Sequence, residues 1–520
     1  DGGNYAVLNP LLFRYAVAAP VFSEANLKQV GGATTLTTTG GTIGVSSGKW
    51  YWEALASTVG NAAHAYGIST NASIASASDT DAVYYKTQSG GEIVANGVDV
   101  QLTLGAIASG DIIGVALDMD AREVSFYKNN ILLGAAEPLV SGVNEYFPMF
   151  RFSSADVQVI NFGQRPFTYT PPTGFKTLHT GNLPDVAIEN GSKYFDSVLW
   201  AGDGAATRSI TVGFQPDWVW FKRRNDISSH QIYDAVRGAT QRLRSDTTDA
   251  ENTQTNGLTS FESDGFTLGG QVGINGSGDT HVAWNWKAGG AAVTNTAGSI
   301  TSQVSASPTA GFSVVAWSGT GSNGTIGHGL GVAPSMLLIK NRDAAGAWRV
   351  WHKLFNGDQF LYLNSTAAVA SQASLFNSTV PSSSVISAGT SGDINWSGRT
   401  YVAYCFSEVP GYSSFGSYVG NGNSDGVFVN LGFKARFLMV KQSNASGRNW
   451  SIWDGKRDTS NVVTNRLLPN GTNADVVADD LDFLSNGFKI RRTGGDFNAS
   501  GGTYIYMAFA ENPFKNSLAR

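Results

Sequence analysis

Three stretches of the chain between residues 194 and 514 repeat one order of short motifs, and this repetition constrains the fold more than any other feature. Each copy opens with a phenylalanine and a Gly-x-Gly sequence, continues to a hydrophobic run that ends in a lysine, and closes on Asn-x-Ser-Gly and an apolar strand. The lysines are Lys222, Lys340 and Lys441. A period on the order of 100 residues is the size of a domain and far longer than the ~20–50 residues of a solenoid repeat. We therefore predict an array of duplicated domains, which presents surfaces and rarely carries one catalytic centre.

The composition supports a folded, β-rich chain of several domains. At ~150 residues per domain, a length of 520 residues predicts three or four domains. Charged residues make up 14% of the chain, against ~25% in an ordinary globular protein, and glycine occupies 62 positions. Low charge with many small polar residues is typical of β-rich surfaces that are hydrated without being ionic. The aromatic content of 11% argues against disorder.

The repeats are predicted to be all-β. Their hydrophobic runs, such as the one from Met336 to Ile339, carry apolar residues at both parities, which is typical of strands buried on both faces. For domains of ~100 residues with Gly and Asn turns between strands, a β-sandwich or jelly roll satisfies this pattern. No segment has a long helical period.

Several classes of function are disfavoured by the residues present. A net charge of −5 gives no general attraction to nucleic acid or anionic lipid, and no stretch approaches the ~20 apolar residues of a membrane span. The six histidines have no metal-ligand spacing, so we expect neither a metal nor another cofactor. The single cysteine, Cys405, lies in an apolar run and is interpreted as a core residue. We predict no catalytic residue and no enzyme activity.

A different module precedes the repeats. Its clearest local signal is a hairpin in which strands at 123–128 and 131–134 flank the turn Asn129-Asn130. The order of its motifs resembles the SPRY (B30.2-like) family over roughly residues 45–165. The matching motifs are Gly48-Lys49-Trp50-Tyr51-Trp52-Glu53, Tyr66-Gly67-Ile68, the run 110–118, Phe126-Tyr127-Lys128-Asn129-Asn130, Tyr146-Phe147-Pro148 and Asn161-Phe162-Gly163. The resemblance implies a two-sheet antiparallel sandwich that binds partners, most often peptides, through loops at one edge, without catalysis.

A wider resemblance sets the predicted domain organisation. The segment 164–176 resembles the exit of SPRY modules in bacteriophage tail and virion proteins, and the three repeats resemble the companion domains of those proteins. We expect an N-terminal attachment segment at 1–44, a SPRY-like sandwich at 45–178, repeat 1 at 190–288, a Gly/Ser/Thr-rich linker at 289–310, repeat 2 at 311–410 and repeat 3 at 411–520. The predicted fold class is all-β, a SPRY-like antiparallel β-sandwich followed by three duplicated β-sandwich or jelly-roll-like domains.

Aromatic side chains recur in the middle of each repeat. His230, Trp348 and Trp450 align, and three residues later Tyr233, Trp351 and Trp453 point to the opposite face of the strand. In one interpretation one set fills the sandwich and the other fills a junction between domains or subunits. In the other interpretation Tyr233, Trp351 and Trp453 form outward platforms that bind a sugar ring.

The resemblance to phage proteins, with the duplication and the low charge, predicts a bacteriophage virion protein. We expect a tail fibre or similar appendage on the particle surface that binds other virion proteins and a host surface receptor, either a glycan or a protein, with no nucleic-acid binding and no membrane insertion. A homo-oligomer is expected, and a trimer because phage fibres usually are trimers. One alternative is a purely structural head-decoration or connector protein.

The other alternative is a polysaccharide depolymerase tailspike. Hydrolysis of a polysaccharide would need two carboxylates that face each other across a sugar. Asp234 and Asp454 recur in repeats 1 and 3, but repeat 2 has His352 at that position. The sequence therefore disfavours this alternative.

Overall fold

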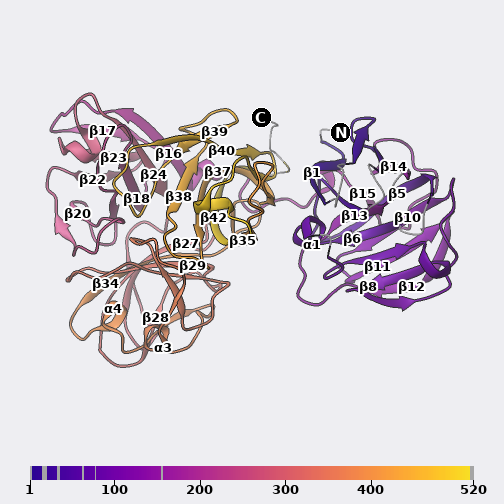
Figure 1. Cartoon of the computed structure of the whole chain (residues 1–520). Coiled ribbons are helices and arrows are strands. Elements are labelled where there is room, and N and C mark those ends of the chain that lie inside the picture. The colour runs from indigo at the N-terminus through magenta and orange to yellow at the C-terminus, as the bar shows by residue number, and fades with distance from the viewer. Residues whose placement is uncertain are drawn as a thin grey trace. The chain divides into compact units, whose positions relative to one another are not determined.

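The computed structural model describes residues 3–14, 20–31, 36–60, 64–76, 78–153, 156–513 and 515. The chain divides into two compact units, Asp1–Asp185 and Val186–Arg520. Strands dominate both units, and the α-helices among the described residues are only four to six residues long (Figure 1). The predicted all-β class is confirmed.

The first unit is a sandwich of two largely antiparallel sheets. In its described residues, one sheet has the order β1 (Leu8–Arg14), β4 (Thr37–Gly41), β13 (Phe147–Phe152), β6 (Ala65–Ser69), β7 (Val83–Lys86), β8 (Glu92–Ala95) and β9 (Val98–Gln101). The other has the order β12 (Ile131–Pro138), β11 (Glu123–Lys128), β10 (Ile112–Asp118), β5 (Lys49–Thr58), β14 (Val157–Asn161), β3 (Lys28–Val30) and β2 (Val21–Ser23), and β15 (Lys176–Thr177) pairs with β5 in parallel. Helix α1 (Asn71–Ser76) contacts β1 and β4. Rings of the two sheets meet between them, as Tyr85 and Phe126 do at 6.4 Å.

The predicted hairpin of the first unit is present. Strands β11 and β12 pair from Lys128 and Ile131 onward, and the turn residues Asn129 and Asn130 have φ of 49° and 69°. Asparagine tolerates this left-handed conformation better than most residues, so the Asn-Asn pair can form the tight turn.

The described part of the segment 1–44 belongs to this sandwich. Strands β1 and β4 lie in one sheet, and β2 and β3 lie in the other. Residues 1–2, 15–19 and 32–35 of the predicted attachment segment lie outside the described residues. The sandwich therefore begins well before the predicted boundary at 45. The Thr/Gly-rich β4 gave no strong strand signal by itself, but it is buried because it pairs with β1 on one side and β13 on the other.

The second unit contains one strand order three times. In each repeat four strands lie side by side in the same order. They are the strand that opens the repeat, the strand that closes it, the strand that carries the recurring lysine and the strand that carries the aligned aromatic residues. In repeat 1 these are β16 (Phe195–Ala201), β24 (Thr280–Trp286), β18 (Trp218–Arg223) and β19 (Gln231–Asp234); in repeat 2, β27 (Phe312–Ser318), β34 (Thr400–Phe406), β29 (Met336–Asn341) and β30 (Arg349–His352); in repeat 3, β35 (Ser413–Val419), β42 (Thr503–Pro513), β37 (Phe433–Gln442) and β38 (Trp450–Asp454).

A smaller sheet covers one face of each of these main sheets. In the described residues these are β17 (Arg208–Thr211), β23 (Gly265–Leu268) and β22 (Leu258–Glu262) in repeat 1; β28 (Gly324–Gly327) and β33 (Val385–Ala388) in repeat 2; and β36 (Phe428–Asn430), β41 (Gly487–Ile490), β40 (Val476–Leu484) and β39 (Val463–Arg466) in repeat 3. Strands β20 (Gln241–Arg242) and β21 (Asn252–Thr253) pair with each other. The short α-helices are α2 (Val272–Asn275), α3 (Ala373–Phe376), α4 (Gly392–Asn395) and α5 (Gly495–Asn498), and the 3-10 turns are Gln88–Gly90, Thr180–Asn182 and Gly191–Lys193. None of the helices in the described part of the chain has the length and apolar character needed to cross a lipid bilayer.

The predicted linker at 289–310 is folded into repeat 2. Its residues form β25 (Val293–Asn295) and β26 (Ser302–Ser307), and β26 pairs with β27 along its whole length. The main sheet of repeat 2 continues at its other edge through β31 (Gln359–Tyr362) and β32 (Ala370–Ser371). The linker prediction is therefore corrected. Small polar residues suit a strand as well as they suit a loop, and the composition alone did not separate the two.

The recurring Gly-x-Gly sequence is explained by a buried asparagine. In repeat 2 the Asn395 side chain accepts the amide of Thr320 at 2.8 Å, and its backbone carbonyl accepts the amide of Gly321 at 2.8 Å. A Cβ atom at Gly319 would lie 2.4 Å from the Trp396 carbonyl oxygen, and Gly321 has φ of 77°. Neither glycine could therefore carry a side chain without strain.

The other two repeats use the same device. Asn275 and Asn498 are fully buried, and they accept the amides of Asp203 at 3.3 Å and Asn421 at 3.1 Å. These loops are thus turns closed by a buried asparagine.

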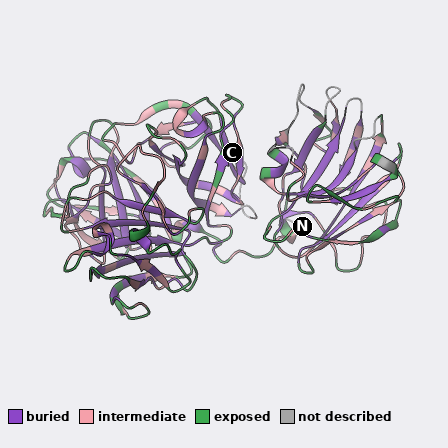
Figure 2. Ribbon diagram, turned by 60° about the horizontal axis from the view of Figure 1, so that its bottom comes forward, coloured by how far each residue is buried: buried purple, intermediate pink, exposed green. Residues whose placement is uncertain are grey.

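Hydrophobic residues of all three repeats meet in one shared core. This core includes Trp218, Trp284, Trp348, Phe406, Trp450 and Phe509. Repeats 1 and 2 also have separate cores between their main and smaller sheets. Figure 2 shows the buried positions following the strands of both units.

Candidate functional site

The sequence offered three aromatic side chains as candidates for ligand binding, and the structure places all three inside the repeats. They are Tyr233, Trp351 and Trp453. Their exposed fractions are 0%, 4% and 0%. Tyr233 packs with residues of β22 and β23, and Trp351 packs with residues of β33, because the smaller sheet covers the face on which they lie. The Trp453 indole donates to Asp480 Oδ2 at 3.1 Å. The structure therefore does not present these rings as outward platforms for a sugar.

The aligned aromatic set on the opposite face lies where repeats meet. Trp348 of repeat 2 donates its indole N–H to the Arg244 carbonyl of repeat 1 at 2.7 Å. Trp450 of repeat 3 donates in the same way to the Tyr362 carbonyl of repeat 2 at 2.9 Å. The buried His230 of repeat 1 occupies the equivalent place. This arrangement is the one that the junction interpretation predicts.

Backbone hydrogen bonds repeat this pattern and close a ring. They run from the amides of Glu251, Val369 and Asp475 to the carbonyls of Arg342, Ser443 and Arg224, at 2.8, 2.8 and 2.7 Å. Repeat 1 thus contacts repeat 2, repeat 2 contacts repeat 3, and repeat 3 contacts repeat 1. One chain therefore forms a closed ring of three similar sandwiches.

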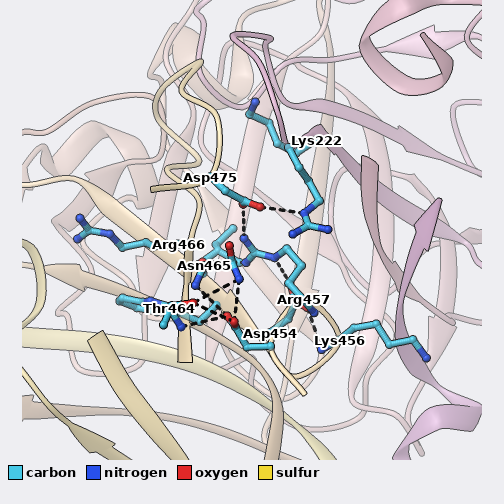
Figure 3. Close-up of polar contacts among 12 residues, drawn as sticks. Lys222, Asp454, Lys456, Arg457, Thr464, Asn465, Arg466 and Asp475 are labelled. Atoms are coloured by element: carbon cyan, nitrogen blue, oxygen red, sulfur yellow. Dashed lines mark hydrogen bonds and ion pairs between the residues drawn. The ribbon is translucent and has the colours of Figure 1, made fainter. Parts of the chain in front are cut away.

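A buried ionic cluster joins repeat 3 to repeat 1 (Figure 3). Arg457 Nε lies 2.6 Å from Asp454 Oδ2, and its Nη1 lies 2.8 Å from Asp475 Oδ1. The other oxygen of Asp475 lies 2.8 Å from Nε of Arg224 in repeat 1, and Trp284 of repeat 1 donates to Asp454 at 2.9 Å. Burial alone would raise the pKa of Asp454, but the charge and hydrogen bonds of Arg457, with the Trp284 bond, hold that pKa below its usual value.

The junction between repeats 1 and 2 has the same design. Arg237 forms ion pairs with Asp234 at 2.5 Å and with Glu251 at 2.7 Å, and Glu251 in turn pairs with Arg342 of repeat 2 at 2.8 Å. The Tyr404 hydroxyl of repeat 2 donates to Asp234 Oδ2 at 2.8 Å.

The junction between repeats 2 and 3 lacks this cluster. His352 stands in place of the aspartate and Phe355 in place of the arginine, and Val369 takes the place of the second carboxylate. Burial lowers the pKa of His352 to about 3, so its ring is neutral near pH 7. The third junction is therefore uncharged at this position.

The aspartates of these clusters were visible in the sequence, but their arginine partners were overlooked. Asp234 and Asp454 are each followed three residues later by arginine, whereas His352 is followed by phenylalanine. The aspartate and the arginine are thus replaced together in repeat 2, and this joint replacement was the signal in the sequence that the two residues form an ion pair. The clusters hold repeats together, and the short Asp–Arg contacts leave no open carboxylate for acid–base chemistry.

The recurring lysines are buried at equivalent places in the three main sheets. Lys222, Lys340 and Lys441 each have an exposed fraction of 0%. Lys340 Nζ donates to the Asn341 carbonyl at 2.8 Å, and Lys441 Nζ donates to the Gln442 carbonyl at 2.9 Å. Burial lowers the pKa of all three to about 8. Carbonyl partners solvate these ammonium groups without a close carboxylate, which fits a structural role.

The other titratable groups weighed in the sequence are also accounted for. Cys405 is fully buried, and burial raises its thiol pKa to about 12, which is the opposite of an activated nucleophile. Among the described residues, no group of three or more His, Cys, Asp or Glu side chains is arranged to hold a metal ion.

An open pocket of about 590 Å³ lies on the first unit. Its lining comes from the turn between β10 and β11 and the loop after β12: Met119, Arg122, Leu139, Ser141, Gly142 and Asn144, with Ser46. Asp118 fixes that turn by accepting the amides of Asp120 at 3.1 Å and Ala121 at 2.8 Å. Arg122 donates from Nη2 to the Val140 carbonyl at 3.0 Å, which ties the two loops together. This pocket is a candidate site for a partner of the first unit.

Comparisons with known proteins agree with the division into two units. A family model described as SPRY domain matches residues 49–165, and one described as Domain of unknown function (DUF7483) matches residues 190–513. The E3 ubiquitin-protein ligase RKP of Arabidopsis thaliana is 36% identical over 76 residues, which are 14% of this chain and 6% of that protein. The chain therefore matches only a small part of this relative.

Solved structures of SPRY domains are similar to part of this chain. The SPRY domain of human HERC1 is 23% identical, with 31% of this chain and 99% of that chain covered and a TM-score of 0.26. A human SPRY domain is 16% identical, with 30% and 99% covered and a TM-score of 0.23.

The DUF7483 model spans the whole ring of three sandwiches, as expected if the ring is one folded body. Since this match covers more than half of the 520 residues, the protein belongs to the DUF7483 family and carries a SPRY domain in front of that family's domain.

Proposed function

We propose that this chain is a structural protein of a bacteriophage particle, a tail fibre or similar appendage that contacts the host cell surface. The observation that carries the proposal is the closed ring: three sandwiches joined through buried junctions form a durable body without a disulfide. An appendage outside the cell needs such a body. The SPRY domain in the same chain supplies the kind of loop surface that its family uses for binding.

The proposal also includes assembly with other virion proteins and a homo-oligomer, for which a trimer is our choice. The ring already satisfies the junction surfaces of its own three repeats, so oligomer contacts would have to use other faces. Light scattering on the 54.9 kDa chain tests this point. A mass of three chains supports the trimer, and a plain monomer counts against it.

The decisive experiment is to localise the chain on particles. Virions from a phage that encodes the chain are labelled with gold-conjugated antibody against residues 186–520 and imaged by electron microscopy. Label on the tail or its fibres, with binding of the purified chain to host cells, supports the adhesin. Virions without label exclude the chain from the particle surface and refute the proposal.

The second candidate is a head-decoration or connector protein. It is favoured by the burial of Tyr233, Trp351 and Trp453, because aromatic faces that serve only assembly would be covered in this way. Label on the head or neck, with no binding of the purified chain to host cells, would select this candidate.

A further inference from the structure

One tryptophan differs from the rest in its surroundings. Among the tryptophans that the structure describes, Trp396 is the exposed one, with an exposed fraction of 56%. It follows helix α4 in repeat 2, and its backbone is held in place. Its amide donates to the Tyr401 hydroxyl at 2.7 Å, and that hydroxyl donates to the Gly392 carbonyl at 2.9 Å.

Repeat 2 departs from the other two repeats around this ring. The residues concerned are Trp396, Arg399 and Arg349, where repeat 1 has Gly276, Asp279 and Gln231 and repeat 3 has Ala499, Gly502 and Ser451. The backbone at this place makes the same contact in repeats 2 and 3, since the Ala499 amide also donates to a tyrosine hydroxyl, that of Tyr504, at 2.7 Å. The fold therefore does not require the tryptophan or the two arginines.

The Trp396 ring has a fixed position on the surface. A Cβ atom at Gly392 would lie 2.9 Å from its Cε3 atom, so the ring rests on a glycine that makes room for it. The Arg399 guanidinium lies 5.6 Å from the ring centroid. Cation–π contact of this kind orients an exposed ring at little cost.

Helix α4, whose Gly392 lies under the ring, also carries Asp393. Asp393 precedes Trp396 by three residues, and 27% of its side chain is exposed. Arg349 Nη2 lies 2.6 Å from Asp393 Oδ2, and the guanidinium is packed against the rings of Phe360 at 4.8 Å and Tyr362 at 4.4 Å. Arg349 is only 7% exposed, yet its Nε and Nη1 have no hydrogen-bond partner among the described residues. Both of these nitrogens are themselves buried, so Arg349 holds Asp393 in place from below the surface.

We propose that Trp396, Arg399 and Asp393 form a glycan-binding site on repeat 2, in which Arg349 positions Asp393. A pyranose ring offers an apolar C–H face to the indole, and its hydroxyls can donate to the Asp393 carboxylate and accept from Arg399. Nucleic acid fits less well, because Asp393 and the net charge of −5 oppose a phosphate backbone. This proposal rests on the proposed host-surface function, and it identifies a glycan as the class of ligand that the chain binds.

The test uses full-length protein and immobilised oligosaccharides from host capsule and lipopolysaccharide, with maltohexaose as a neutral reference. Trp396→Ala copies repeat 3 and Arg399→Gly does the same, so both variants should fold with unchanged circular dichroism. Ala499→Gly, at the equivalent place in repeat 3, is the matched control. We expect binding to weaken by about tenfold or more in Trp396→Ala, to weaken less in Arg399→Gly, and to be unchanged in Ala499→Gly.

Three outcomes overturn the site: no glycan binding by the wild-type chain, equal binding by Trp396→Ala, or loss of an oligomer in Trp396→Ala, which would make the ring a subunit contact. Binding of the wild-type chain and of Trp396→Ala to whole host cells separates the two proposals. Equal cell binding by both proteins rejects the glycan site and leaves the host-surface function standing. Trp396-dependent glycan binding without cell binding supports the site and rejects the host-surface function.

Discussion

Replacing Arg457 with leucine tests how the ring of repeats is held together. The guanidinium is fully buried and contacts Asp454, Asp475 and, from Nη2, the Ile452 carbonyl at 3.1 Å. After the change, Asp454 keeps the Trp284 bond and the amides of the turn but loses its counter-charge, while its exposed fraction is 0% in the native fold.

The expected loss is large because one partner of a buried pair is removed. Such a change costs about 3–5 kcal/mol of unfolding free energy, mostly as the penalty of leaving a carboxylate buried and uncompensated. For a body of this size that loss corresponds to a fall in Tm of about 5 °C. Urea unfolding followed by tryptophan fluorescence measures it, since Trp284 lies at the junction itself.

The double variant Asp454→Leu with Arg457→Leu isolates the cause. Repeat 2 already holds uncharged residues, His352 and Phe355, at these two places, so the architecture accepts an uncharged pair. The double variant should therefore regain most of the stability that Arg457→Leu loses. Lys456→Met, which removes a charge next to Arg457 but outside the cluster, is the control and should stay within about 0.5 kcal/mol of the wild type.

The pH dependence gives a second readout. In the wild type the folded pKa of Asp454 lies below its ordinary value, so its contribution is complete above that ordinary pKa and is lost as pH falls through the folded pKa. In Arg457→Leu only burial and hydrogen bonds remain, and burial raises the pKa, so Asp454 should be protonated at a higher pH than in the wild type and the stability deficit should shrink as the pH falls. The reasoning is refuted if Arg457→Leu unfolds like the wild type, or if the double variant is less stable than the single one.

Three further predictions concern buried residues of the repeats. Lys340 has a folded pKa of about 8, below its unfolded value, so the unfolded chain binds more protons between about pH 8 and 10.5 and the free energy of unfolding should rise with pH in that range. Lys340→Met should make this rise less steep when the free energy of unfolding is measured by urea titration at several pH values. An unchanged slope would contradict a buried ammonium group. Asn395→Ala removes the side-chain partner of the Thr320 amide and should cost about 2–3 kcal/mol in the same assay, whereas a cost under about 0.5 kcal/mol would show that water replaces the side chain. Cys405 should react with a thiol reagent only at the rate of unfolding, and a fast native-state reaction would contradict its burial.

Much of the fold followed from local patterns in the sequence. The hairpin at Asn129-Asn130 was predictable because its turn and its strands are contiguous, and the apolar runs marked the central strands of each repeat. Strands β4 and β26 were not predictable, because they are rich in Thr, Ser and Gly and are defined by the strands with which they pair.

The candidate sites could be predicted only in part. Strand parity placed Trp348 and Trp351 on opposite faces, but it could not say which face meets another repeat, because that depends on contacts such as Trp348 with Arg244 across about 100 residues of chain. The sequence left open whether Tyr233, Trp351 and Trp453 are platforms or packing residues, and the structure places all three inside the repeats. Trp396 stands at the variable position of the motif Asn-x-Ser-Gly that the repeats share. The shared positions indicate the common fold, and they give no signal for a residue that only repeat 2 has.

A ring made from one chain has a freedom that a ring of three identical subunits lacks. In a symmetric trimer every junction and every surface position occurs three times, so a change at one is imposed on all. Here repeat 2 replaces an ion pair with His352 and Phe355 and places Trp396 where its neighbours have small residues, while the junctions formed by Arg237 and Arg457 keep their charges. The two charged junctions secure the ring, and this leaves repeat 2 free to differ at its surface. On this argument, a binding function should be sought on repeat 2 first, at the positions where it departs from the pattern that repeats 1 and 3 retain.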